Sequence, residues 1–298
     1  MSSFEAFTYT ELIPHRSLPA TSLLRIDRGM PKEALLIRLL LGTVDFHHVL
    51  SGQTISQRKN FSILPAIPNT VISNTIFRNL LAPDFKKKDL ENYLRTHRSN
   101  ADFFKNIILE ISHYFYQANK KSHTVAFLYL YRALEAISYC FPLIYAARST
   151  NFIGTYKKLK SFFSDKERSE LKFFSIFIDN LFSDNLVLLD VPVEFVLTAP
   201  DLNIQEIFFD TLSHILTNDR ISDSTRPNSI KVKCRDLLGF TVDLRNRYFH
   251  FLTGGIRNLN SSEIVEPDWF FSLINDSIAN WIAYIYFNIL KYVLEQRY

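Results

Sequence analysis

The chain has 298 residues, of which 47% are hydrophobic, so it is long and apolar enough to bury a core and is not disordered as a whole. Its 27 Phe and 14 Tyr against only 7 Gly disfavour turn-rich all-β folds and glycine-dependent dinucleotide-binding folds. The formal net charge of +4 is small, so a polyanionic partner has to be argued from local clusters of Lys and Arg.

The first residues, Met1 to Leu12, carry two glutamates and lack the basic start and apolar core of a signal peptide. Cys140 and Cys234 lie far apart without a CxxC partner, which predicts reduced thiols in a cytoplasmic protein and no metal site or cofactor. The most apolar stretch, 277–290, has 14 residues, fewer than the roughly 18 to 20 that a membrane span requires. We therefore expect a buried helix there and no membrane contact.

Residues 1–95 are predicted to form an N-terminal arm or small accessory region. Six of the eleven prolines fall before residue 85, a spacing that long helices do not tolerate. One helix is expected from Lys32 to about Val49, introduced by Pro31. The remainder is expected to be strand, turn or arm.

A basic run follows Pro83, with several cations within a few turns: Lys86, Lys87, Lys88, Arg95 and Arg98. One interpretation is the solvated face of a short helix. The other is a patch that attracts RNA phosphates, which needs no precise geometry. The sequence leaves both open.

Residues 96–298 show helical periodicity, and the predicted fold class is mainly all-α. An extended segment or small hairpin is expected at 186–199, and a polar loop at 217–230. The first expected helices run from Ser99 or Asn100 to Ala118 and from Thr124 to a kink or end at Pro142. Two shorter helices are expected within 153–182, followed by one from Asn203 to Leu216. The last two are expected from Lys231 to Leu252, before Gly254-Gly255, and from Pro267 to Glu295.

Arg132 and Glu135 are the only charges between His123 and Arg148, and their three-residue spacing puts them on neighbouring positions of one helix face. Charges on a buried helix need partners. They form either an internal ion pair between helices or a support in which Glu135 orients Arg245 or His250.

The most polar part of the helix expected at 231–252 is the stretch from Asp243 to His250. At about 100° per residue, one stripe forms the predicted core face: Leu237, Thr241, Leu244, Tyr248 and Leu252. Asn246 and His250 fall nearly opposite, and Phe249 also falls away from this stripe, which favours a contact with a second protein surface. Alternatively the helix is central, covered on both sides, with His250 hydrogen-bonded inside.

The segment Arg245-Asn246-Arg247-Tyr248-Phe249-His250 resembles the R-x4-H motif of HEPN domains, which are helical bundles found in bacterial defence and toxin ribonucleases. An earlier predicted helix carries Tyr131-Arg132-Ala133-Leu134-Glu135, which fits the same arrangement. The resemblance implies a HEPN-like helical domain over 96–298 and metal-independent RNA cleavage by a homodimer whose motif-bearing faces meet. Leu252 stands where one toxin branch has a modifiable tyrosine, so that regulation is not expected here.

The chemistry also favours pairing, because internal RNA cleavage needs a base at the 2′-hydroxyl and an acid at the leaving 5′-oxygen on opposite sides of phosphorus. Two copies of His250 meet this need, with Arg245 stabilising the developing charge and Asn246 orienting the imidazole or the phosphate. The expected supporting residues are Glu135, Arg132 and Arg247, and the expected RNA-binding residues are Lys231, Lys233, Arg235 and Arg257.

These observations predict a metal-independent endoribonuclease of anti-phage defence or toxin type, with RNA such as tRNA or mRNA as substrate and an antitoxin or sensor protein as a further partner. The alternative is a catalytically inactive HEPN-like module that binds RNA or a partner protein. A third interpretation is a structural helical protein in which the motif residues are internal hydrogen-bonding partners.

Overall fold

The computed structural model describes residues 5–11, 18, 20–27, 29–68, 87–148, 153–154, 156–157, 160, 170–182, 186–249 and 258–295. The chain forms two compact units, one of Met1–Lys120 with Ile282–Tyr298 and one of Lys121–Trp281. The sequence-based division between residues 95 and 96 stays a prediction.

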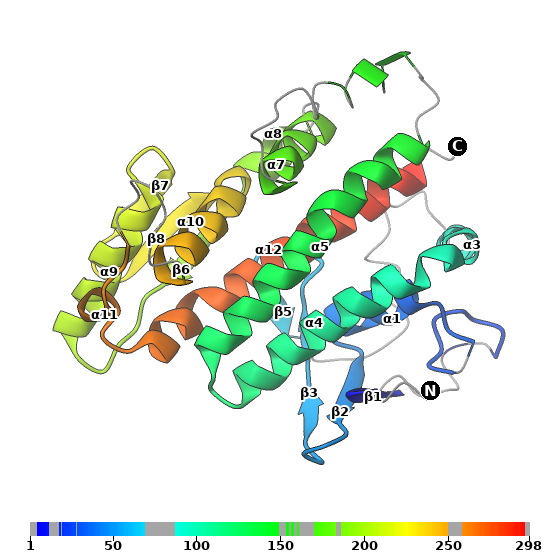
Figure 1. The fold of residues 1–298 in the computed structure, drawn as a ribbon, viewed down its shortest axis with the longest axis horizontal. Coiled ribbons are helices and arrows are strands. Elements are labelled where there is room, and N and C mark those ends of the chain that lie inside the picture. Colours follow the sequence, from blue (N-terminus) through cyan, green and yellow to red (C-terminus); the bar gives the residue numbers. More distant parts are fainter. Residues whose placement is uncertain are drawn as a thin grey trace. The chain divides into compact units, whose positions relative to one another are not determined.

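The predicted all-α fold class is wrong, because strands and helices are both present and the fold is mixed α/β (Figure 1). The described residues form three antiparallel sheets, with strand orders β1-β2-β3, β4-β5 and β6-β8-β7. The strands are β1 (Phe7–Glu11), β2 (Val44–His48), β3 (Thr54–Ser56), β4 (Lys59–Asn60), β5 (Ile67–Pro68), β6 (Pro192–Val196), β7 (Ile221–Thr225) and β8 (Ser229–Lys233).

The first unit holds the short elements expected before residue 95. Its helices are α1 (Lys32–Leu40), α3 (Lys87–Thr96), the 3-10 helix η2 (Arg98–Asn100), α4 (Ala101–Asn119) and the last part of α12 (Pro267–Glu295). The helix predicted from Ser99 or Asn100 to about Ala118 is thereby confirmed as α4. α1 packs along α4, and both lie beside the sheet of β1, β2 and β3 (Figure 1). Phe7 and Tyr9 of β1 face this interior, whereas Thr8 and Thr10 are exposed, as strand alternation requires.

The helix predicted from Lys32 to Val49 ends early. α1 stops at Leu40, and Gly42 follows with a φ of +68°, a left-handed conformation that side chains disfavour. The chain then turns into β2, whose Asp45 and Phe46 pair with Thr10 and Tyr9 of β1. Pairing with a distant strand therefore overrides the local helical pattern.

A buried arginine ties these elements together. Arg38 has no exposed surface and forms an ion pair with Glu11 of β1. Its guanidinium also donates to the Leu24 carbonyl at 2.8 Å and to the Thr43 carbonyl at 3.0 Å. Burial lowers the pKa of Arg38, and the neighbouring Glu11 carboxylate counteracts that shift. The charge is therefore tolerated because almost every donor has an acceptor.

In the second unit, the polar loop predicted at 217–230 is wrong, because β7 and β8 form a hairpin there. β7 is largely exposed and gives no apolar alternation to recognise. β8 does alternate, with Ile230 and Val232 buried. The start predicted for the next helix, at Lys231, is accordingly wrong. The 3-10 helix η3 (Cys234–Asp236) comes first, and the α-helix that follows it is α10 (Leu237–Phe249).

The remaining helices of this unit are α5 (His123–Arg148), α7 (Glu170–Leu181), α8 (Leu186–Asp190), α9 (Leu202–Leu216), α11 (Ser261–Ile264) and the first part of α12. α5 does not end at Pro142, and α8 replaces the start of the extended segment predicted at 186–199. α9 is confirmed, although its cap is Asp201, whose side chain accepts from the Asn203 backbone amide at 2.7 Å. α12 is confirmed over its whole predicted length.

Within the described ranges, no helix is both long and apolar enough to cross a bilayer.

Gly42→Ala should lower the free energy of unfolding by about 2 to 4 kcal/mol, since an added Cβ would lie 2.8 Å from the Arg58 carbonyl carbon and the Lys59 oxygen. Gly52→Ala is the matched control: its φ is +70° but nothing lies within 4 Å, so a loss of about 1 kcal/mol is expected. Urea unfolding measures both. Equal losses would contradict the close approach at Gly42.

Cys234 is a free, buried thiol, as predicted, whereas the side chain of Cys140 lies outside the described residues. Burial raises the pKa of Cys234 to about 12. In a Cys140→Ser background, Cys234 should react with a thiol reagent at pH 8 only after denaturant is added. Because the folded state disfavours the thiolate, this group also favours unfolding as the pH rises from about 9 toward 12. Rapid labelling of the native protein would contradict the burial.

Candidate functional site

The helix α10 carries the described part of the R-x4-H motif, and its core face is largely as predicted. Leu237, Thr241 and Leu244 have no exposed surface, and the Thr241 hydroxyl donates to the Leu237 carbonyl at 2.7 Å. Leu252 and His250 lie outside the described residues. The candidate site is therefore built from Arg245, Asn246 and what packs against them.

Phe249 does not face outward as predicted. It is half-buried, and its ring stacks on Phe127 of α5 with centroids 6.0 Å apart and an interplanar angle of 4°. Phe271 of α12 lies 6.1 Å from Phe249 and 5.0 Å from Phe127. Phe127 and Phe271 are fully buried. The prediction fails because α10 also packs against α5 and α12 on the side next to its core stripe, where Phe249 lies.

Arg245, like Phe249, contacts α5. Its guanidinium carbon lies 5.0 Å from the centroid of the Tyr131 ring on α5, within cation–π range. Phe127 and Tyr131 are four residues apart, as are Phe249 and Arg245, so each pair lies on one face of its helix. The contacts Phe127–Phe249 and Tyr131–Arg245 therefore lie one helical turn apart between α5 and α10. Their order shows that the two helices run antiparallel where they meet.

A surface cavity of about 280 Å³ opens beside the Arg245–Tyr131 contact. Its lining comes from one face of α5 and from α10: Val125, Leu128, Tyr129, Tyr131, Arg132, Glu135 and Arg245. Arg132, Glu135 and Arg245 were predicted from the sequence, and the structure brings them to this one cavity. The sequence therefore identified the charged residues that line the cavity.

The charges of the cavity are unequal. Its lining includes two guanidinium groups, of Arg132 and Arg245, and one carboxylate, that of Glu135. The pKa of Tyr131 is raised chiefly by burial, while Arg245 acts against this shift and Glu135 adds to it, which places the phenol within the field of both. Within the described part of the chain, no carboxylate forms an ion pair with Arg245. The two guanidinium groups are donors whose geometry suits an anion such as a phosphate.

Asn246 and Arg247 make other contacts. The Asn246 side-chain oxygen accepts from Arg245 Nη1 at 3.1 Å, so it restrains the guanidinium. Arg247 points to α9, where its Nη1 donates to the His214 carbonyl at 3.3 Å. Arg247 does not line the cavity and serves as a link between helices.

The residues predicted to bind RNA do not line this cavity: Lys231 and Lys233 lie on β8, and Arg235 lies on η3. Lys231 pairs with Asp223 at 2.9 Å, and Lys233 and Arg235 pair with Asp190 at 3.6 and 2.8 Å. These pairs are well exposed, and such pairs contribute little stability and exchange readily. Arg257 lies outside the described residues. The cationic segment is thus partly neutralised by neighbouring acids.

The sequence did not identify the apolar and aromatic lining of the cavity. Val125, Leu128 and Tyr129 lie one to two turns before Arg132 on α5, so the cavity is apolar at one end and cationic at the other. The sequence named Tyr131 only within the segment from Tyr131 to Glu135, and its side chain is 5% exposed. Its role under Arg245 depends on α10 packing there, which no local pattern records.

No family model, no curated protein and no solved structure matches this chain. Among the described residues, no group of three or more His, Cys, Asp and Glu side chains is arranged to hold a metal ion.

Phe249→Ala should lower the free energy of unfolding by about 2 to 3 kcal/mol, because the ring leaves a gap against Phe127 and Phe271. Asn246→Ala, three residues earlier on α10, should change it by less than about 1 kcal/mol, since Asn246 loses only its hydrogen bond to Arg245. Urea unfolding compares the two variants. If Phe249→Ala costs no more than Asn246→Ala, the inward packing of Phe249 is wrong.

Proposed function

We propose that this protein is a metal-independent endoribonuclease of the cytoplasm, acting as an anti-phage defence or toxin effector. The observation that carries the proposal is the position of Arg245: its guanidinium rests on Tyr131 at the rim of a cavity that also holds Arg132 and Glu135. The segment from Arg245 to His250 resembles the R-x4-H motif, and this resemblance supports the same reaction.

In the proposed reaction the 2′-oxygen of a ribose attacks the adjacent phosphorus and the bond to the 5′-oxygen breaks. One His250 takes the proton of the 2′-hydroxyl, and His250 of a second copy gives a proton to the leaving 5′-oxygen. A histidine side chain has an ordinary pKa of about 6.5 and exchanges protons near neutral pH. The products are a 2′,3′-cyclic phosphate and a 5′-hydroxyl.

Arg245 and Arg132 neutralise the charge that develops on the phosphorane oxygens, the stage at which fixed cations contribute most. Asn246 limits the rotation of Arg245 through its hydrogen bond. Glu135 lowers the net positive charge of the cavity and helps to orient its arginines. Lys231, Lys233 and Arg235 bind flanking phosphates by exchanging their exposed carboxylate partners for RNA.

The proposed active form is a homodimer, because one histidine cannot occupy both sides of a phosphorus atom. The substrate is RNA such as tRNA or mRNA, and an antitoxin or sensor protein restrains the activity.

Purified protein incubated with total RNA in the presence of EDTA should produce new ends with a 2′,3′-cyclic phosphate. Arg245→Ala should lower the cleavage rate by about 100-fold or more, because it removes a donor to the phosphorane. His250→Ala should abolish cleavage. Sequencing of the new ends and gel-based rates provide the measurement.

Arg247→Ala is the matched control, since this arginine lies two residues from Arg245 but donates to the His214 carbonyl. Its cleavage rate should stay within a few-fold of wild type. RNA binding without cleavage would favour the alternative, an inactive module that binds RNA. A requirement for added metal would exclude the proposed mechanism.

A further inference from the structure

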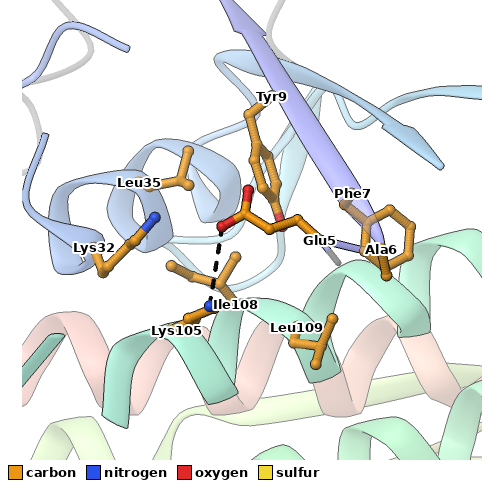
Figure 2. Close-up of a pocket in the computed structure, with 9 residues that line it drawn as sticks. All are labelled: Glu5, Ala6, Phe7, Tyr9, Lys32, Leu35, Lys105, Ile108 and Leu109. Atoms are coloured by element: carbon orange, nitrogen blue, oxygen red, sulfur yellow. Dashed lines mark ion pairs between the residues drawn. The ribbon is translucent and has the colours of Figure 1, made fainter. Parts of the chain in front are cut away.

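A second cavity lies in the first unit, between β1, α1 and α4, and plays no part in the proposed ribonuclease reaction. Its volume is about 150 Å³. Figure 2 shows its lining, which comes from all three elements and the residues before β1: Glu5, Ala6, Phe7, Tyr9, Lys32, Leu35, Lys105, Ile108 and Leu109.

The walls of this cavity are apolar. Phe7, Leu35 and Ile108 are 3%, 6% and 4% exposed and form its interior, and Leu109 lies at the rim with 37% exposed. The Tyr9 hydroxyl is engaged with Ser112 Oγ at 2.9 Å, and burial raises the pKa of this phenol, so it stays neutral. An apolar cavity of about this volume holds a benzene ring in another protein.

The mouth of the cavity is charged. Lys32, at the start of α1, and Lys105, on α4, line it together with one carboxylate, that of Glu5. Figure 2 shows the Glu5 carboxylate directed toward Lys105, and their charged atoms are 3.9 Å apart. Both side chains are about half exposed, so this is a weak and replaceable ion pair. The lining of this cavity itself therefore holds two ammonium groups and one carboxylate.

The cavity also continues past Lys32. A more open space of about 490 Å³ shares Glu5, Tyr9, Lys32 and Leu35 with it. The cavity therefore adjoins an open space on the side of Lys32, where the Asp27 carboxylate also lies.

We propose that this cavity binds a small organic monoanion, with an apolar body of about the size of a benzene ring between Phe7, Leu35 and Ile108 and its anionic group between Lys32 and Lys105. The apolar body is removed from water, which is favourable at roughly 25 cal/mol per Å². The anion competes with Glu5 for the two ammonium groups. Charge and shape together select the ligand, because neither an apolar alcohol nor a small carboxylate satisfies both ends.

The test uses the full chain and three probes: benzoate, benzyl alcohol as its neutral counterpart, and acetate as the anion without the ring. Binding is measured by NMR chemical shifts of the lining residues. Benzoate should shift the resonances of Ile108 and Leu109 in a saturable manner and bind more tightly than either of the other probes. Absence of saturable benzoate shifts, or equal affinity for benzyl alcohol, would overturn the proposal.

Variants test the two ends separately. Lys32→Gln and Lys105→Gln should each weaken benzoate binding about two- to five-fold without changing benzyl alcohol binding. Glu5→Gln should tighten benzoate binding about two-fold, because it removes the competing carboxylate. Ala6→Leu should weaken benzoate and benzyl alcohol alike, because it occupies the cavity. Lys88→Gln, on α3 and outside the lining, is the control. If the two lysine variants bind benzoate as Lys88→Gln does, the anion does not sit between Lys32 and Lys105.

Discussion

The stacking of Phe249 on Phe127 is the contact on which the candidate site depends. It holds the last turn of α10 against α5, with Phe271 of α12 closing the cluster. Because Arg245 lies one turn before Phe249, and Tyr131 one turn after Phe127, the same contact places the guanidinium over the phenol. The position of Arg245 therefore follows from aromatic packing and from the antiparallel direction of two helices.

The first unit depends on polar groups that are buried in matched sets. Arg38 is paired with Glu11 and fills its remaining donors with backbone oxygens. Glu33 accepts hydrogen bonds from Tyr93 at 2.8 Å and Tyr286 at 3.1 Å, so that three elements distant in sequence meet at one carboxylate. Removing one member of such a set leaves the other buried without its partner, which typically costs 3 to 5 kcal/mol for a charge pair.

The two proposed sites share a physical design. Each combines apolar walls with two cationic side chains and one carboxylate: two arginines and Glu135 beside α10, and two lysines and Glu5 beside β1. They differ in the kind of cation. The arginines present planar donors suited to phosphate oxygens, whereas the lysines act as compact charges on flexible stems. This difference is why we assign a phosphodiester to one cavity and a small organic anion to the other.

The sequence by itself determined the long helices α4, α9 and α12, since their apolar periodicity and end signals are local properties of the chain. It also singled out Arg132 and Glu135, as isolated charges on an apolar helix, and Arg245, through the motif resemblance. Only the tertiary structure decided that Lys231 lies on a strand, that α1 ends before Gly42, and that Phe249 faces inward. Strand pairing and the choice between two covered faces of a helix depend on partners far away in the sequence, and no local pattern contains them.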